Sequence, residues 1–184
     1  MNAPLFAGPN GQLRDARGWL LLVSLVVVAL DRVTKLLVAK NVALGSAIVV
    51  VPGVFRITHV LNIGAAFSLF ADAASPMAVR IGLILFSLLA AGIVMAMLWK
   101  YGRTFSLASV GFALVLGGAV GNLYDRIHLH YVIDFLEVYV FGYHWPDFNV
   151  ADSAITVGAV LLLAEMMWPD GSAKATAAGE PSAT

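Results

Sequence analysis

Apolar residues dominate four long stretches of the chain, and each stretch is long enough to cross a membrane as a helix. These stretches cover residues 18–39, 77–99, 104–123 and 150–168. A helix needs about 20 consecutive, mostly apolar residues to span the hydrocarbon core of a bilayer. The pattern therefore predicts an all-α membrane protein with four transmembrane helices.

The first long connection, residues 40–76, carries a second kind of pattern. Its part from residue 47 to 62 is rich in Val, Ile and Phe, and Pro52-Gly53 marks a turn within it. Rough alternation of apolar and polar residues follows from 55 to 60, as is typical of a strand with one buried face. We expect a small β element here, outside the membrane or on its surface.

The second long connection, residues 124–149, is dense in Tyr, Trp, Phe and His. Aromatic residues of this kind concentrate where a membrane meets water. The sequence therefore favours a short interfacial amphipathic helix near 132–140.

The remaining segments bound the domain. Residues 1–17 form a polar segment that contains Gly and Pro, and residues 169–184 form a low-complexity tail rich in Ala, Ser, Gly and Pro. Both are predicted to be disordered, which leaves 18–168 as one membrane domain. Four spans place both termini on one side of the membrane and both long connections on the other. Lys and Arg occur on both sides, so charge alone leaves the orientation open.

Composition supports a membrane protein and excludes some chemistry. Of the 184 residues, 60% are hydrophobic and only 12% are charged, whereas soluble domains carry about 25% charged residues. The formal net charge of zero offers no basic surface for nucleic acid. The chain has no cysteine, so disulfides, thiolate catalysis and cysteine-ligated metals are excluded.

Charged residues inside the first stretch need partners, because a charge at the bilayer centre costs about 2.5–3.5 kcal/mol on insertion scales. Asp31 and Lys35 lie four residues apart on one helix face and are predicted to form an ion pair, with Lys35 extending outward to the membrane surface. The alternative is that Lys35 contacts the head group of an anionic ligand.

The third stretch contains Gly117-x-x-x-Gly121, a spacing of small residues that lets helix backbones approach closely. The approaching helix is either one of the protein's own or a substrate helix. Asn122, Asp125 and Arg126 follow within about one turn. The two charged residues are explained as capping and anchoring the helix end, whereas an amide at this depth needs hydrogen-bond partners.

Two aspartates are the strongest candidates for chemistry. Asn149 suits a helix N-cap, which places Asp152 in the first turn, where the helix dipole favours negative charge. Taken alone, Asp152 is explained by that structural role. Asp134 lies in a predicted loop between Ile133 and Phe135, so we expect it to be partly buried with a raised pKa.

If Asp134 and Asp152 meet, they share a proton, since two adjacent carboxylates cannot both ionise. One then activates a water and the other polarises a carbonyl, which is the chemistry of aspartic proteases and needs neither metal nor other cofactor. Two alternatives stay open from the residues alone. One is a proton or ion carrier with a relay through Asp31 and both acids; the other is a scaffold built on the glycine face. A metal at His128, His130 and Asp125 is only weakly indicated.

Five segments resemble, in order and spacing, the signature segments of the bacterial lipoprotein signal peptidase family, signal peptidase II. They are "DRVTK" (31–35), "NIGAAF" (62–67), "GGAVGNLYDR" (117–126), "VIDF" (132–135) and "FNVADSAI" (148–155). The resemblance covers residues 18–168.

The resemblance implies an aspartic endopeptidase of the bacterial cytoplasmic membrane that removes the signal peptide of a prolipoprotein just before its diacylglyceryl-cysteine and is blocked by globomycin. It implies that Asp134 and Asp152 are catalytic. The other positions it implies for substrate binding or support of the aspartates are Asn62, Gly64, Asn122, Asp125, Arg126, Asn149, Asp31 and Lys35. It also implies cytoplasmic termini and long connections on the outer, periplasmic side. We expect a monomer in contact with membrane lipid, with no metal, cofactor or nucleic acid.

Overall fold

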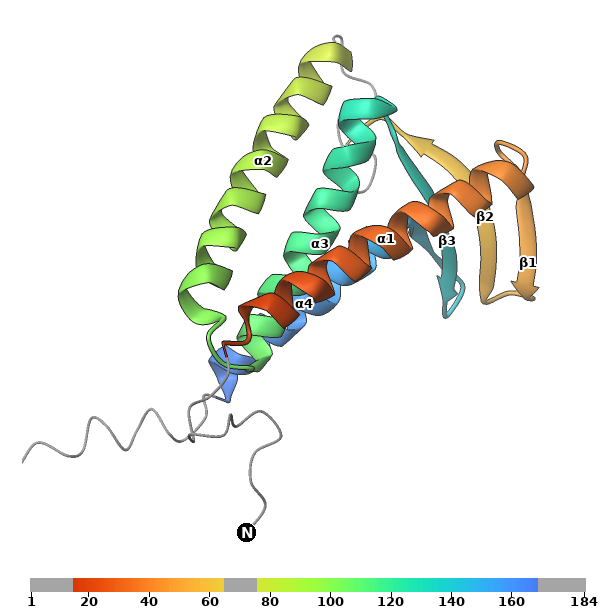
Figure 1. Cartoon of the computed structure of the whole chain (residues 1–184). Helices are drawn as coiled ribbons and strands as arrows, with labels where there is room; N and C mark the ends of the chain where they lie inside the picture. Colours follow the sequence, from red (N-terminus) through yellow and green to blue (C-terminus); the bar gives the residue numbers. More distant parts are fainter. Residues whose placement is uncertain (1–14, 65–75, 169–184) are drawn as a thin grey trace, which may run out of the picture.

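The computed structural model describes residues 15–64 and 76–168, which form four helices and four strands (Figure 1). The helices are α1 (Arg17–Asn41), α2 (Pro76–Tyr101), α3 (Leu107–His128) and α4 (Val150–Met167). Each coincides with one of the four apolar stretches, so the helices are confirmed where the sequence predicts them. The predicted tails lie almost wholly outside the described residues.

Three of these helices, α2, α3 and α4, are long and apolar enough to cross a membrane. Helix α1 has 25 residues, a length of about 37 Å at the rise of an α-helix. Its apolar stretch is interrupted by Asp31, Arg32 and Lys35, which sets it apart from the other three. Whether α1 is a fourth span therefore depends on where these charges lie.

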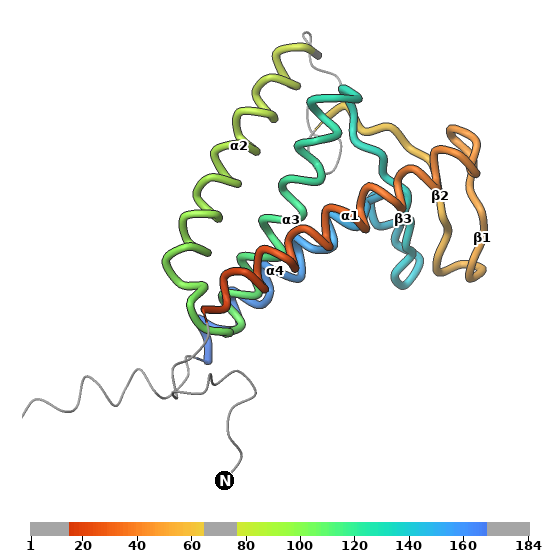
Figure 2. Tube along the Cα trace, in the orientation of Figure 1, coloured from red at the N-terminus to blue at the C-terminus, as the bar shows by residue number. Residues whose placement is uncertain are grey.

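Helix α3 is the centre of the helical part and contacts α1, α2 and α4; Figure 2 shows it between α1 and α2. Its glycines permit this packing. A Cβ at Gly117 would lie 2.8 Å from the carbonyl oxygen of Ser24 in α1, and one at Gly118 would collide with the carbonyl oxygen of Ala151 in α4. Gly121 faces a carboxylate of α1. The small-residue pattern is thus used by the protein's own helices, and the expectation that it receives a substrate helix is wrong.

Both long connections contribute to one antiparallel sheet with the strand order β1-β2-β3-β4. The strands are β1 (Ala47–Val51), β2 (Phe55–Asn62), β3 (Val132–Val140) and β4 (Tyr143–Phe148). The central pair joins the two connections, with Phe55 opposite Val138 and Asn62 opposite Val132. The β element predicted for the first connection is confirmed, and the second connection completes it.

The amphipathic helix expected near 132–140 is wrong, because this segment is strand β3. Six of its nine residues are β-branched or aromatic, the types that suit a pleated, half-buried surface. β3 also pairs with a strand on each side, so its backbone groups are satisfied within the sheet. Asp134 accordingly lies on a strand and not in a loop.

A buried apolar cluster fixes the sheet to the end of α1. It contains Val38 from that helix, its C-cap Val42, and Ile133 and Phe135 from β3. The cluster holds one end of β3 beside the start of α4, where the polar residues of the molecule gather.

Candidate active site

Helix α4 begins with a reciprocal capping box that fixes Asp152. The side-chain oxygen of Asn149 accepts the backbone N–H of Asp152 at 2.9 Å, and Asp152 Oδ2 accepts the backbone N–H of Asn149 at 3.3 Å. Asn149 has the extended backbone of an N-cap residue. The predicted N-cap is confirmed, and Asp152 lies in the first turn, where the helix dipole favours a negative charge.

Asp134 is buried on β3, with only 3% of its surface exposed. Its Oδ1 accepts a hydrogen bond from Asn149 Nδ2 at 2.8 Å, and its Oδ2 accepts one from Asn62 Nδ2 at 2.9 Å. Burial raises the pKa of Asp134 from its ordinary value of 3.8 to about 7; the two amides lower it, and the charge of Asp152 raises it. The predicted burial and raised pKa are confirmed.

Two asparagine side chains connect the aspartates. Asn149 caps the helix of Asp152 and donates to Asp134, as above. Asn122 on α3 donates from Nδ2 to Asp152 Oδ1 at 2.8 Å, and its Oδ1 lies 3.3 Å from Asn149 Nδ2. The partners predicted for the Asn122 amide are thus confirmed, and the acids from β3 and α4 belong to one hydrogen-bonded group.

A pocket of about 780 Å³ opens beside this group and is lined by both aspartates. Its lining comes from α2, α3, α4 and the sheet. The polar lining includes Asn62, Asn122, Arg126, Asp134 and Asp152, and the apolar lining includes Leu83, Phe86, Val115, Val132, Phe148, Ile155 and Val157. A large, mostly apolar pocket with a few convergent polar groups is the usual form of a ligand site. Nothing in the sequence indicated that α2 lines this pocket, because its apolar residues do not differ from those of a helix that faces only lipid.

Beneath the site lies an ion network with no exposed side-chain surface on Asp31, Lys35 or Asp125. Lys35 Nζ is 2.7 Å from Asp31 Oδ2, 2.7 Å from Asp125 Oδ2 and 3.1 Å from Asn122 Oδ1. The predicted Asp31–Lys35 pair is confirmed. The outward course of Lys35 and its contact with an external head group are wrong, because its ammonium group is fully buried between Asp31, Asp125 and the amide oxygen of Asn122. Asp125 is likewise a network residue and not a helix cap.

The network also orients the site. Because Lys35 donates to the oxygen of the Asn122 amide, the NH₂ end must face Asp152. Asp31 Oδ1 accepts the backbone N–H of Ala151 at 3.0 Å and so holds the first turn of α4 from a different helix. The ions of α1 therefore turn inward and support the position of Asp152.

Arg32 belongs to the same network, although the sequence did not single it out. Its guanidinium pairs with Asp125 and lies 4.4 Å from the ring centroid of Tyr124. The one feature of the sequence that could have indicated Arg32 is its position in "DRVTK", between Asp31 and Lys35. Its pairing partner lies 93 residues away, beyond what spacing indicates.

The remaining predicted residues lie at the rim of the site. Arg126 lines the pocket and donates to the backbone carbonyl of Asn122 at 3.3 Å. The backbone N–H of Gly64 donates to Asn62 Oδ1 at 3.0 Å. This contact turns the NH₂ end of Asn62 toward Asp134, just as Lys35 does for Asn122.

The weak metal candidate of His128, His130 and Asp125 is not assembled, since Asp125 is enclosed in the ion network. Among the described residues, three potential ligands come together on the sheet: Glu137, His144 and Asp147. Arg56 already neutralises Glu137 through both carboxylate oxygens, and this hydrogen bonding lowers the pKa of Glu137. The group is explained as an internal ion-pair cluster.

Fold and site together define a membrane protein whose polar centre lies beside a large apolar pocket. Comparison with known proteins narrows this class. Residues 23–168 match the family model described as signal peptidase (SPase) II. The chain is 45% identical over 147 residues to a lipoprotein signal peptidase of Desulforapulum autotrophicum, covering 78% of this chain and 88% of the relative. It is 44% identical over 161 residues to that of Pseudomonas putida, covering 87% and 90%.

A solved structure shares the fold with a TM-score of 0.73 and 27% identity, and the match covers 91% of this chain and 94% of the other. It is described as a bacterial membrane enzyme. The chain therefore belongs to the signal peptidase II family and is a protease. This assignment decides against the ion-carrier and scaffold alternatives.

Proposed function

We propose that the protein is an intramembrane aspartic endopeptidase that removes signal peptides from prolipoproteins, cutting just before a diacylglyceryl-cysteine. One observation carries the proposal: Asp134 and Asp152 line the same pocket and are joined through Asn149. The mostly apolar lining suits a signal helix and acyl chains. The substrate class follows from the relatives, which are named lipoprotein signal peptidases.

The two acids have different surroundings, and this difference assigns their roles. Asp134, with a pKa of about 7, holds the shared proton. Asp152 accepts two N–H bonds at a helix N-terminus, an environment that suits the charged form. Asp152 is therefore the base that takes a proton from water, and Asp134 is the acid that hydrogen-bonds the scissile carbonyl oxygen.

The reaction then needs no covalent enzyme intermediate. The hydroxide oxygen bonds to the carbonyl carbon while Asp134 gives its proton to the carbonyl oxygen, which forms a tetrahedral diol. Asp152 returns its proton to the amide nitrogen, the C–N bond breaks, and Asp134 recovers a proton from the diol. The products are a signal peptide with a new carboxyl group and a protein with a free amine at its lipidated cysteine.

The other polar residues position these groups. Asn62, held by Gly64, and Asn149 fix Asp134, whereas Asn122, held by Lys35, fixes Asp152. Arg126 is the donor left to bind a substrate carbonyl, since among the described residues its guanidinium donates a 3.3 Å hydrogen bond to one backbone oxygen, and other N–H groups remain for a substrate.

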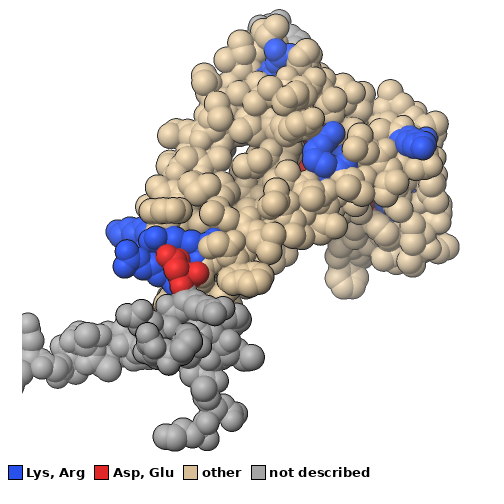
Figure 3. All heavy atoms as spheres, in the orientation of Figure 1, with Lys and Arg blue, Asp and Glu red and all other residues tan. Residues whose placement is uncertain are grey.

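We further propose that α1 is a fourth span, so that both termini lie in the cytoplasm. The inward turn supports this, because Asp31 and Lys35 are fully buried and the partly exposed Arg32 is paired with Asp125. Figure 3 shows a largely uncharged face on which the largest group of Lys and Arg lies where α1 begins and α2 ends, and smaller groups lie at the other end of α2, along α1 and at the sheet. Basic residues favour the cytoplasmic side, which places the pocket toward the outer leaflet.

The test uses purified protein in detergent with a diacylglyceryl-modified prolipoprotein. Asp134→Asn and Asp152→Asn should each reduce kcat/KM by about 10²–10⁴, the range for losing a general acid or base. The matched control is Asp147→Asn, because Asp147 lines the same pocket but accepts its hydrogen bond from Thr58. Near-normal cleavage by either dyad variant, or equal loss in the control, would refute the assignment.

A further inference from the structure

The two turns of the sheet lie side by side and are unusually apolar. Because β2 and β3 are antiparallel, the β1-β2 and β3-β4 hairpin turns fall at the same end of the sheet, and Tyr139 donates its backbone N–H to Val54 O at 2.8 Å between them. The turns carry five exposed apolar side chains, here called the turn rim: Val51, Val54, Val140, Phe141 and Tyr143. Neither 51–54 nor 140–143 contains a charged residue. Pro52-Gly53 and Gly142 are ordinary turn residues, but Phe141 and the apolar residues that flank the turns are not, so the rim needs an explanation.

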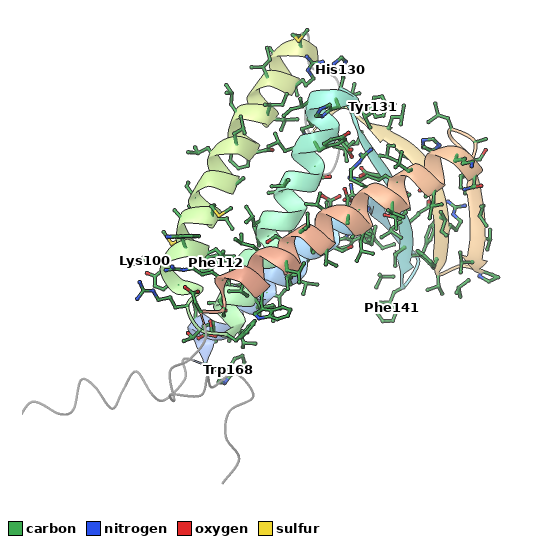
Figure 4. The ribbon with its side chains drawn as sticks, viewed as in Figure 1. Lys100, Phe112, His130, Tyr131, Phe141 and Trp168 are labelled. Carbon is green, nitrogen blue, oxygen red and sulfur yellow. The ribbon has the colours of Figure 1, made fainter. Side chains whose placement is uncertain are left out.

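Phe141 is the most unexpected member of the turn rim. Its side chain is fully exposed, at 106% of the reference area, and it projects beyond the hairpin (Figure 4). Its φ of 50°, followed by a φ of 81° at Gly142, gives the two left-handed residues of a tight hairpin turn. Asn-Gly is the preferred pair there, and a bulky side chain is disfavoured at positive φ. A residue that is both poor for the turn and exposed to water indicates a contact outside the chain.

The direction of the sheet indicates which contact. Strand β1 runs back from the end of α1, so the turns lie level with the helices and not beyond their ends (Figure 1). The site end of the sheet, with Asn62 and Val132, is the opposite end. Helix α1, which carries the sheet, presents Leu30, Val33 and Leu37 outward, each more than half exposed. An apolar, uncharged rim beside an apolar helix surface matches the interface and outer acyl region of a bilayer.

We propose that the turn rim inserts into the outer leaflet and holds the sheet, with Asp134 on it, at a fixed depth. This inference rests on the membrane arrangement proposed above. Tyr143 suits the head-group level, and Phe141 reaches below it. Close to the turns, the carboxylate of Glu137 on β3 pairs with Arg56 on β2 and with His144 on β4, so its charge is neutralised within the sheet.

Spin labelling tests the depth directly, because the chain has no cysteine. Phe141→Cys is labelled with a nitroxide in vesicles of phosphatidylethanolamine and phosphatidylglycerol. Its collisions with oxygen and with a water-soluble nickel complex are then compared. The matched control is Ser46→Cys, an exposed site just before β1 at the opposite end of the sheet. We expect the label at 141 to collide more often with oxygen and the label at 46 to collide more often with the nickel complex. Equal collision rates of the two labels with nickel overturn the proposal. Spin–spin broadening at 141 also overturns it, because it would indicate a second copy of the protein at the rim.

Two substitutions separate lipid contact from folding. Phe141→Asn gives the preferred turn sequence, so its thermal stability in detergent should equal or exceed that of the wild type. Phe141→Asp should lower cleavage of a vesicle-embedded prolipoprotein about tenfold, the ratio expected when one buried aromatic contact is lost, while Ser46→Asp stays normal. Unchanged cleavage by Phe141→Asp overturns the proposal. If the wild type does not cleave the prolipoprotein at all, that result counts against the proposed function instead. The spin-label measurement of depth does not depend on cleavage.

Discussion

Replacing Asn149 with alanine removes one side chain that serves both aspartates. The variant loses the N-cap of α4, worth about 1 kcal/mol, because Oδ1 no longer accepts the N–H of Asp152. It also leaves Oδ1 of buried Asp134 without its 2.8 Å bond, and a buried acceptor left unsatisfied costs about 1–3 kcal/mol. We therefore expect Asn149→Ala to lower the free energy of unfolding by about 3 kcal/mol, measured by thermal or denaturant unfolding in detergent.

The same variant should shift the pH dependence. Asp134 has a pKa raised from 3.8 to about 7, so the folded state loses stability as pH rises from 3.8 and the loss is complete above about 7. The Asn149 hydrogen bond lowers this pKa, so its removal raises the pKa further. Because the proposed chemistry needs Asp134 protonated, the fall of kcat/KM at alkaline pH should move to higher pH in Asn149→Ala.

Asn149→Ser is the matched control for this pair of effects. Serine is a good N-cap but has no N–H₂ group, so it should recover about 1 kcal/mol of stability without restoring the donor to Asp134. Both variants should show the same alkaline shift. The reasoning is refuted if the pH profile stays unchanged in both, or if serine restores the wild-type profile.

Two further substitutions test the support beneath the site. Lys35→Met leaves two buried carboxylates without their shared cation, so the variant should lose about 3–5 kcal/mol of unfolding free energy. Its control is Lys40→Met at the exposed end of the same helix, whose unfolding free energy should stay within about 0.5 kcal/mol of the wild type. Equal melting temperatures of the two variants would contradict the network. Gly118→Ala places a methyl group against a carbonyl of α4 and should cost about 1–3 kcal/mol. Gly92→Ala meets nothing within 4 Å and should leave thermal stability unchanged or raised, so a similar loss in both would rule out close packing as the cause.

The sequence by itself determined the local features. Apolar runs of spanning length located all four helices, because each long run needs the internal hydrogen bonding that a helix provides. The N-cap at Asn149 and the pair of Asp31 with Lys35 follow from interactions within one helical turn. The burial of Asp134 followed from its two apolar neighbours.

Tertiary structure decided what depends on partners distant in the chain. Residues 132–140 form a strand because β2 and β4 supply ladder partners on both sides, which periodicity within the segment does not reveal. Lys35 turns inward because its ammonium group pairs with Asp125 and donates a hydrogen bond to Asn122, both about 90 residues later in the chain. The closing of β3 onto the start of α4 places Asp134 and Asp152 in one pocket, since only the fold determines which buried polar groups find one another.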